Sequence, residues 1–365
     1  MMKRIAAIVI GLAVIVSALV VMTMLRKSPV LTVVTWSGPY GRAQASALFV
    51  PYSQRAAIDV RIAQYDGGLD ELRKQVTSRQ YEWDAVDLEL PDAIAACREG
   101  LLEPIDASSL AAGRNGEPAK SDFVANALGP CWVGSVVYSQ VIAYAPARFG
   151  TARPISLSDF FDTVRFPGPR ALKSTSAKFN LELALLADGV APDGVYRVLS
   201  TPQGIARAFA KLDTIRASIV WWARAGDPAE MLEDGRAAFA TILNGDAYEA
   251  ANQRRSLGVI WDRQLYELDV FGIPKGDPKR EMAMDFVRFA TSAASLARVS
   301  GWVPYGPARR SAIDLVGKNP ELGIAMRPFL PTAPEHFSTA FAVDDAWWQA
   351  HGPEVIPRWE AWRGK

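Results

Sequence analysis

SVVYSQVIAY, at residues 135–144, is a long run of residues that mostly favour β-strands. A strand of that length can leave one domain and enter another. Residues 269–276, DVFGIPKG, have the pattern of a strand that returns. The two segments predict two lobes, between which the chain crosses near Tyr138 and again near Phe271. Such an arrangement forms a cleft, and clefts between domains are common sites for small ligands.

The residues that precede and follow these two segments alternate between strand and helix patterns. From residue 31 to residue 89 the order is strand, helix, strand, helix, strand, with a turn at residues 37–41. This order is typical of an α/β domain with a largely parallel sheet. Residues 240–245 predict a strand that ends at a helix cap, and residues 279–296 predict one amphipathic helix.

Length and composition fit two folded domains. The chain has 365 residues, of which 50% are hydrophobic and 22% charged, which is enough for two packed cores. We expect a first lobe of residues 29–138 and 272–365 and a second lobe of residues 139–271. Lysine and arginine (40) nearly balance aspartate and glutamate (39), so the chain lacks the basic surface that nucleic-acid binding needs.

The first 28 residues have the pattern of an export segment. Residues 1–4 are a short basic start, residues 5–25 are almost entirely apolar, and Arg26 and Lys27 follow. The apolar run is also long enough to span a bilayer, which takes about 20 residues. A signal peptide cleaved after Ala18 and an uncleaved signal anchor both fit. We therefore expect the protein in the periplasm, either free or tethered to the inner membrane.

Cys97 and Cys131 are the only two cysteines, and they lie 34 positions apart. An even pair in an exported chain suggests one disulfide, and the alternative is two separate buried thiols. With two histidines in the whole chain and no ligand cluster near either cysteine, we expect no metal site. The motifs of phosphate loops, dinucleotide folds and serine hydrolases are absent, so we expect no cofactor and no enzyme activity.

Aromatic residues in turns are the candidates for ligand contact. The chain has 11 tryptophans, and Trp36 and Tyr40 bracket a Gly-Pro turn, while Trp302 follows a glycine in a loop. Aromatic faces combined with carboxylates hold ammonium groups through cation–π attraction and ion pairing. We expect Trp36 and Trp302 in the cleft. The tryptophans that we expect to pack in the cores are Trp261, Trp347, Trp348, Trp359 and Trp362.

Several segments between about residue 31 and residue 362 carry a family resemblance. They are TWSGPY at 35–40, WDAVDLE at 83–89, EGLLEPID at 99–106, LSDFFD at 157–162, FPG at 166–168, LNG at 243–245, LD at 268–269 and IPKG at 273–276. In their order and spacing the chain resembles the spermidine/putrescine-binding proteins of polyamine ABC importers, within the extracellular solute-binding proteins. The resemblance implies the type II periplasmic-binding-protein fold, in which two β crossovers join two α/β lobes that close on a ligand.

The resemblance also implies roles for individual residues. Trp36 and Tyr40 match an aromatic pair that stacks on the polyamine chain, Asp269 matches an aspartate that pairs with an amine, and Trp302 matches an aromatic residue that packs on the ligand. Three positions depart from the family pattern. They are Leu243 where the family often has tryptophan, residues 174–180 where it has an acidic pair, and Glu267 where it has an aromatic residue.

Two ligand classes follow from these departures. Glu89 and Glu267 can replace the missing acidic charges, which favours a small amine such as putrescine or spermidine. Alternatively, Arg42, Lys173 and Arg224 favour a ligand that carries a carboxylate, such as an amino-acid derivative, or another polar solute. In either case we expect a monomeric substrate-binding component that delivers its solute to an ABC permease of the inner membrane. The competing class is a ligand sensor for a membrane receptor.

Overall fold

The computed structural model describes residues 28–64 and 66–364, and ten strands in this part of the chain form one sheet. The strands are β1 (Val30–Thr35), β2 (Asp59–Gln64), β3 (Ala85–Glu89), β4 (Val133–Tyr144), β5 (Arg170–Lys173), β6 (Ile219–Trp222), β7 (Phe239–Leu243), β8 (Gly258–Gly272), β9 (Gly306–Pro307) and β10 (Phe341–Ala342). The α-helices are α2 (Gly38–Gln44), α3 (Val50–Ala56), α4 (Asp70–Ser78), α5 (Leu90–Arg98), α6 (Ala119–Asp122), α7 (Leu157–Phe161), α8 (Asn180–Ala187), α9 (Val195–Leu199), α10 (Pro202–Asp213), α11 (Asp227–Glu233), α12 (Asn244–Asn252), α13 (Arg280–Ala290), α14 (Ala293–Trp302), α15 (Pro334–Phe337) and α16 (Asp345–Arg363).

The sheet has a parallel group of strands at each end and two antiparallel strands between them. Its order is β2-β1-β3-β8-β4-β7-β5-β6. The strands β1, β2 and β3 are parallel to one another, and so are β5, β6 and β7. The predicted α/β class is therefore confirmed, and each parallel group is the sheet of one lobe.

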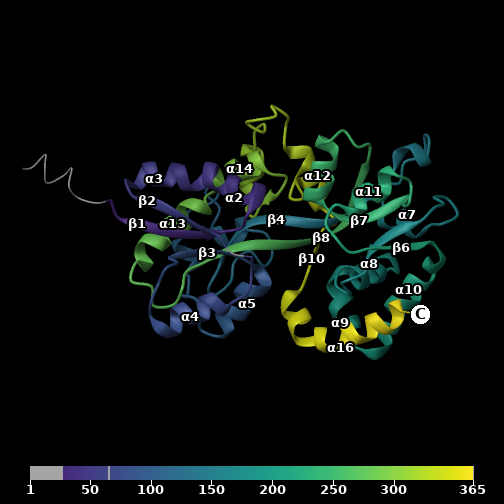
Figure 1. The fold of residues 1–365 in the computed structure, drawn as a ribbon, viewed down its shortest axis with the longest axis horizontal. Coiled ribbons are helices and arrows are strands. Elements are labelled where there is room, and N and C mark those ends of the chain that lie inside the picture. The colour runs from purple at the N-terminus through teal and green to yellow at the C-terminus, as the bar shows by residue number, and fades with distance from the viewer. Residues whose placement is uncertain (1–27, 65, 365) are drawn as a thin grey trace, which may run out of the picture.

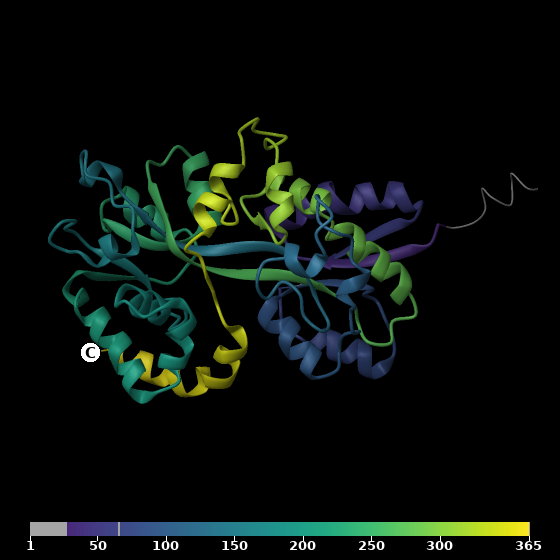
Figure 2. The same ribbon diagram turned by 180° about the vertical axis from the view of Figure 1, so that it is seen from behind.

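The two long strands β4 and β8 run from one lobe into the other (Figure 1). Val136 and Val137 of β4 pack in the core built around β1 and β3, whereas Ile142 and Tyr144 pack in a second core built from residues 142–362. Figure 2 shows the same pair of strands bridging the two groups of helices from behind. The predicted crossing at residues 135–144 is confirmed.

The second crossing lies earlier in the chain than the sequence predicts. Leu265 packs in the second core, whereas Tyr266 and Leu268 pack in the first. Phe271, where we expected the crossing, is already deep in the first core, with its ring 5.5 Å from that of Phe286. The division into residues 29–138 and 272–365 against 139–271 stays a prediction, which the core packing refines at this boundary.

Helix α16 packs on the second lobe, although it follows residues that belong to the first. Trp362 stacks on Phe209 of α10 with ring centroids 5.4 Å apart, and Trp348 Nε1 donates to Glu182 Oε1 at 2.6 Å. The expectation that the tryptophans of this region pack in a core is confirmed for the four in α16. We therefore propose to assign residues 341–363 to the second lobe.

Two local predictions are corrected by capping chemistry. The predicted turn at residues 37–41 is instead the start of α2, because Pro39 has the fixed φ that suits the first turn of a helix. The single helix predicted at residues 279–296 is two helices. The first helix ends at Ala290, and Ser292 caps α14, since its Oγ accepts from the backbone N–H of Ser295.

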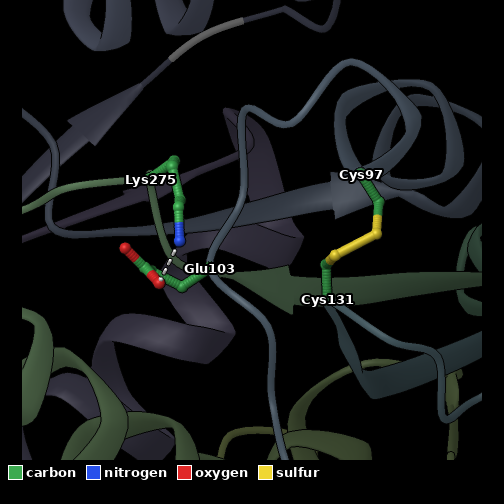
Figure 3. Close-up of a disulfide and its surroundings, with 4 residues drawn as sticks. All are labelled: Cys97, Glu103, Cys131 and Lys275. Carbon is green, nitrogen blue, oxygen red and sulfur yellow. Dashed lines mark hydrogen bonds and ion pairs between the residues drawn. A yellow bond between two sulfur atoms is a disulfide. The ribbon is translucent and has the colours of Figure 1, made fainter.

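The structure joins Cys97 and Cys131 in the predicted disulfide, with their Cα atoms 5.8 Å apart (Figure 3). The bond fastens the end of α5 to the segment that enters β4. Beside it, Lys275 Nζ pairs with Glu103 Oε2 at 3.0 Å, which ties the same region to the chain beyond β8. The disulfide therefore lies wholly within the first lobe.

Residues 1–27 of the predicted export segment lie outside the described residues, so the structure does not address signal or anchor. Within the described ranges, no helix combines the length and apolar character that a membrane span requires.

Removing the disulfide should destabilise the protein without changing the fold. Closing a loop of 34 positions stabilises by about 3–4 kcal/mol on the chain-entropy model. The double variant Cys97→Ala/Cys131→Ala should therefore unfold at a lower denaturant concentration, measured by tryptophan fluorescence. Reductant should shift the wild type to the same midpoint and leave the variant unchanged. Equal midpoints for oxidised wild type and variant would contradict the prediction.

Candidate functional site

The strand register gathers acidic side chains at the point where the lobes join. Glu89 of β3 lies directly opposite Asp269 of β8, and Glu267 lies opposite Tyr138 of β4. Directly opposite residues share one face of a sheet, and so do alternate residues along a strand. Asp87, Glu89, Glu267 and Asp269 therefore lie on the same face, with Tyr138 among them.

This acidic face is mostly shielded from solvent. Asp87, Glu267 and Asp269 are buried, whereas Glu89 is exposed. Burial, followed by the charges of Asp87 and Glu89, raises the pKa of Asp269 well above its usual range. Desolvation also raises the pKa of Glu89. Glu89 is thus partly desolvated by the protein and still reached by water, as a carboxyl group in a recess would be. The acidic face therefore opens to solvent at Glu89.

Three tyrosine rings surround the acidic face. The ring centroids of Tyr40 and Tyr305 are 5.5 Å apart, and those of Tyr138 and Tyr305 are 6.3 Å apart. The pairing of β9 with β4 brings Tyr305 to this place, because it precedes β9 directly. Burial, with smaller effects of Asp269 and Asp246, raises the pKa of Tyr305 to about 12. The rings thus stay neutral beside the carboxylates, an arrangement that suits an ammonium group.

A hydrogen-bond network fixes the first of these rings. Gln44 Nε2 donates to Tyr40 Oη at 2.8 Å and to Asp87 Oδ2 at 2.7 Å. Thr35 Oγ1 donates in turn to Gln44 Oε1. Tyr40 and Gln44 are four residues apart in α2, so they lie on one face of that helix. The helix that starts at the Gly-Pro sequence therefore orients both side chains toward β3.

The second lobe faces Tyr305 with the residues that start α12. Asn244 Oδ1 accepts from the backbone N–H of Ser139 at 2.9 Å, and Asn244 Nδ2 donates to Pro304 O at 2.6 Å. A Cβ atom at Gly245 would lie 3.1 Å from the Tyr305 ring, so the two lobes are already in close contact here. The absence of a side chain at Gly245 is what allows this approach.

Two lysines of the second lobe add positive charge. Lys173 at the end of β5 is half-buried, and its charge lowers the pKa of Glu89 and of Asp246 against the dominant effect of their burial. Lys178 Nζ pairs with Glu267 Oε1 and with Asp345 Oδ1, the latter at 2.7 Å. Glu267 is therefore already paired with a cation inside the protein.

An interlobe groove with a volume of about 580 Å³ lies beside this region. Residues of both lobes line it, among them Trp132 on one side and Tyr196 on the other. Leu90, next to Glu89 in the chain, and Asp345, the partner of Lys178, also line the groove. The groove therefore lies next to the acidic face, although Asp87, Glu89, Glu267 and Asp269 do not themselves line it.

The structure brings some of the predicted site residues together and leaves others apart. Tyr40, Glu89, Glu267 and Asp269 form the acidic face with its first ring. Trp36 follows β1 and is half-buried, and its ring lies within 3.4 Å of a Cβ built at Gly67.

Trp302 ends α14, and its carbonyl accepts from Asn319 Nδ2 at 3.0 Å. The ring against Tyr40 is that of Tyr305, further along the same segment. Of the three predicted cations, Lys173 lies near the site. Arg42 is exposed, and Arg224 is exposed and pairs with Asp227 at 3.4 Å.

Sequence reasoning missed Tyr138, Tyr305 and Lys178. Tyr138 was identified only as a crossing point, and its role depends on the register that pairs it with Glu267. The position of Tyr138 in its strand was a usable signal. Alternate residues of a strand share one face, so the position predicts the face of Tyr138 once the neighbouring strand is known. Tyr305 and Lys178 lie in connecting segments, for which the sequence offers no comparable signal.

Comparisons with known proteins identify the family. The sequence model of the family described as bacterial extracellular solute-binding protein matches residues 47–324. The gamma-aminobutyric acid-binding protein of Pseudomonas aeruginosa is 34% identical over 339 residues, which are 93% of this chain and 92% of that protein. The chain therefore belongs to the bacterial extracellular solute-binding proteins.

Solved structures of similar sequence have the same fold. An ABC transporter substrate-binding protein from Bradyrhizobium japonicum USDA 110 is 28% identical, with a TM-score of 0.75, over 92% of this chain and 99% of that one. A GABA receptor is 29% identical, with a TM-score of 0.72, over 91% of this chain and 97% of that one. The type II periplasmic-binding-protein fold that the sequence predicts is confirmed.

The stability of the ligand-free protein should fall as pH rises from about 5 to about 8. Burial raises the pKa of Asp87 from 3.8 to about 8. The folded state therefore binds a proton that the unfolded state has lost, so the free energy of unfolding decreases through this window. Asp87→Asn should flatten the fall in melting temperature. The exposed Asp59→Asn should keep the wild-type slope, and an unchanged slope in Asp87→Asn would contradict the assignment.

Proposed function

We propose that this solute-binding protein is the substrate-binding component of an ABC importer and that it captures a small amino-acid-like solute such as GABA. The observation that carries the proposal is an acidic face with three tyrosine rings in the first lobe, opposite the half-buried Lys173 of the second. Such a solute carries an ammonium group at one end and a carboxylate at the other, which matches the charges of the two sides.

The ammonium group belongs at Asp269 and Glu89. These carboxylates lie directly opposite each other on adjacent strands, where like charges repel. A cation between them relieves that repulsion and favours the charged form of Asp269, whose pKa burial otherwise raises. The faces of Tyr40, Tyr138 and Tyr305 add cation–π attraction in a partly desolvated place.

The carboxylate belongs at Lys173. Of the three cations expected from the sequence, it is the one whose charge acts on Glu89 from the second lobe. A diamine such as putrescine would bring its second ammonium to the side of the cleft that already carries Lys173 and Lys178, where like charges repel. The 34% identity to a gamma-aminobutyric acid-binding protein supports the same choice. We therefore favour the amino-acid-like ligand over the polyamine that the sequence resemblance suggested.

Capture requires no chemical step. The solute enters between the lobes, pairs its two ends with opposite sides, and stabilises the closed arrangement that a permease recognises. The contact between Tyr305 and Gly245 is the place where the two sides meet. We propose that this happens in the periplasm, with the protein as a monomer that is free or tethered by its N-terminal segment.

The amine assignment predicts a charge-specific loss of affinity in Asp269→Asn. GABA should raise the melting temperature of the wild type, because a ligand that binds only the folded state stabilises it by mass action. Loss of one partner of a desolvated charge pair typically costs 2–5 kcal/mol, so Asp269→Asn should weaken GABA binding by about 30-fold or more, measured by calorimetry. Asp59→Asn is the matched control on an exposed strand position. A shift with putrescine and none with GABA or its homologues would overturn the ligand assignment.

The carboxylate assignment predicts that Lys173→Met changes selectivity. The variant should weaken the binding of GABA by about tenfold or more. The affinity for 4-amino-1-butanol, which has the same amine and no carboxylate, should stay nearly unchanged. The exposed Lys120→Met serves as the control for removal of a surface charge. Equal losses for both solutes, titrated by calorimetry, would contradict a carboxylate contact at Lys173.

A further inference from the structure

Lys178 occupies a position between two acidic side chains that come from separate elements. Its Nζ pairs with Glu267 of β8 and with Asp345 at the start of α16. The side chains of Glu267 and Asp345 are 8% and 1% exposed, and that of Lys178 is 21% exposed. Desolvation lowers the pKa of Lys178, but the two ion pairs outweigh it and raise that pKa above the usual range. The lysine therefore remains an ammonium ion inside the site.

The loop that carries Lys178 is held in one conformation. Asn180 Nδ2 donates to Lys173 O at 2.9 Å and to Ser176 O at 2.7 Å, so the first residue of α8 is hydrogen-bonded to the end of β5 and to the middle of the loop. Phe179 has a φ of 74°, an unfavourable value for a residue with a Cβ. Such backbone strain persists only where the surrounding contacts impose it. Here they impose a loop that directs Lys178 at the two carboxylates.

Asp345 retains capacity for a further donor. Its Oδ2 is buried and has no hydrogen-bond partner among the described residues. Asp345 also lines the interlobe groove of about 580 Å³. A solute in the groove therefore passes next to Asp345. Among the described residues, the ammonium of Lys178 is the only cation that pairs with Glu267 and Asp345.

We propose that Lys178 is a specificity-determining residue, whose ammonium occupies the place that the second amine of a diamine would take. With Lys178 present, Glu267 and Asp345 already share one ammonium of the protein, and Glu89 with Asp269 remain for one ammonium of the solute. The cleft then accepts monoamines that carry a carboxylate and discriminates against diamines. This inference rests on the proposed capture of an amine-bearing solute, and it adds the residue that discriminates between solutes with one amine and solutes with two.

The test compares diamine and monoamine affinity in Lys178→Met and Lys178→Arg. By calorimetry, the ratio of putrescine to GABA affinity should rise by roughly tenfold or more in Lys178→Met, because two buried carboxylates then lack a cation. Lys178→Arg keeps a cation at this place and should keep the wild-type ratio. The double variant Lys178→Met/Asp345→Asn removes one of the two carboxylates and should lose most of the gain. An unchanged ratio in a folded Lys178→Met overturns the proposal.

A second measurement separates this inference from the proposed function and guards against misfolding. Methylammonium should raise the melting temperature of Lys178→Met more than that of Lys178→Arg, since it can replace the missing ammonium. Where Lys178→Met does not fold, Lys178→Gln, which can still donate a hydrogen bond to Glu267, takes its place in both assays. Failure of methylammonium to distinguish the variants overturns the inference. Failure of the wild type to bind any amino-acid-like solute overturns the proposed function alone.

Discussion

The strands β4 and β8 pair with each other along most of their length. Each also pairs, antiparallel, with one strand from the parallel group of a lobe: β8 with β3, and β4 with β7. This pairing holds the two lobes in one continuous sheet. It also sets the register in which Glu89, Asp269, Glu267 and Tyr138 share one face. The same backbone hydrogen bonds therefore connect the lobes and assemble the acidic face, so a shift of one residue would remove both the acidic pair and its neighbouring ring.

Crowded carboxylates repel one another, and the protein offsets that repulsion in a different way at each position. The amide of Gln44 hydrogen-bonds to Asp87, and the ammonium of Lys178 pairs with both Glu267 and Asp345. No comparable cation among the described residues pairs with Asp269, whose pKa burial and neighbouring charges raise. Under the proposed function, a cationic solute supplies the compensation at that position.

The sequence allowed prediction of the features that depend on local patterns. The β-rich run at residues 135–144 predicted a crossing strand, and the segments ending at Glu89 and Asp269 predicted acidic positions of the site. It did not reveal Tyr305 or Lys178, because their roles depend on β9 joining β4 and on a strained loop, neither of which leaves a periodic signal. The return of α16 to the second lobe was equally hidden, since the long-range partner Glu182 of Trp348 cannot be read from either segment alone.

The disulfide between Cys97 and Cys131 has a consequence for the order in which the protein matures. Both cysteines precede β8, yet the core of the first lobe also requires residues 266–312, which follow residues 142–265 of the second core in the chain. As the polypeptide emerges on the oxidising side of a membrane, the thiols can couple while the sheet of the first lobe still lacks β8. The covalent bond then keeps α5 beside the entrance to β4 until the returning segment arrives to complete that lobe.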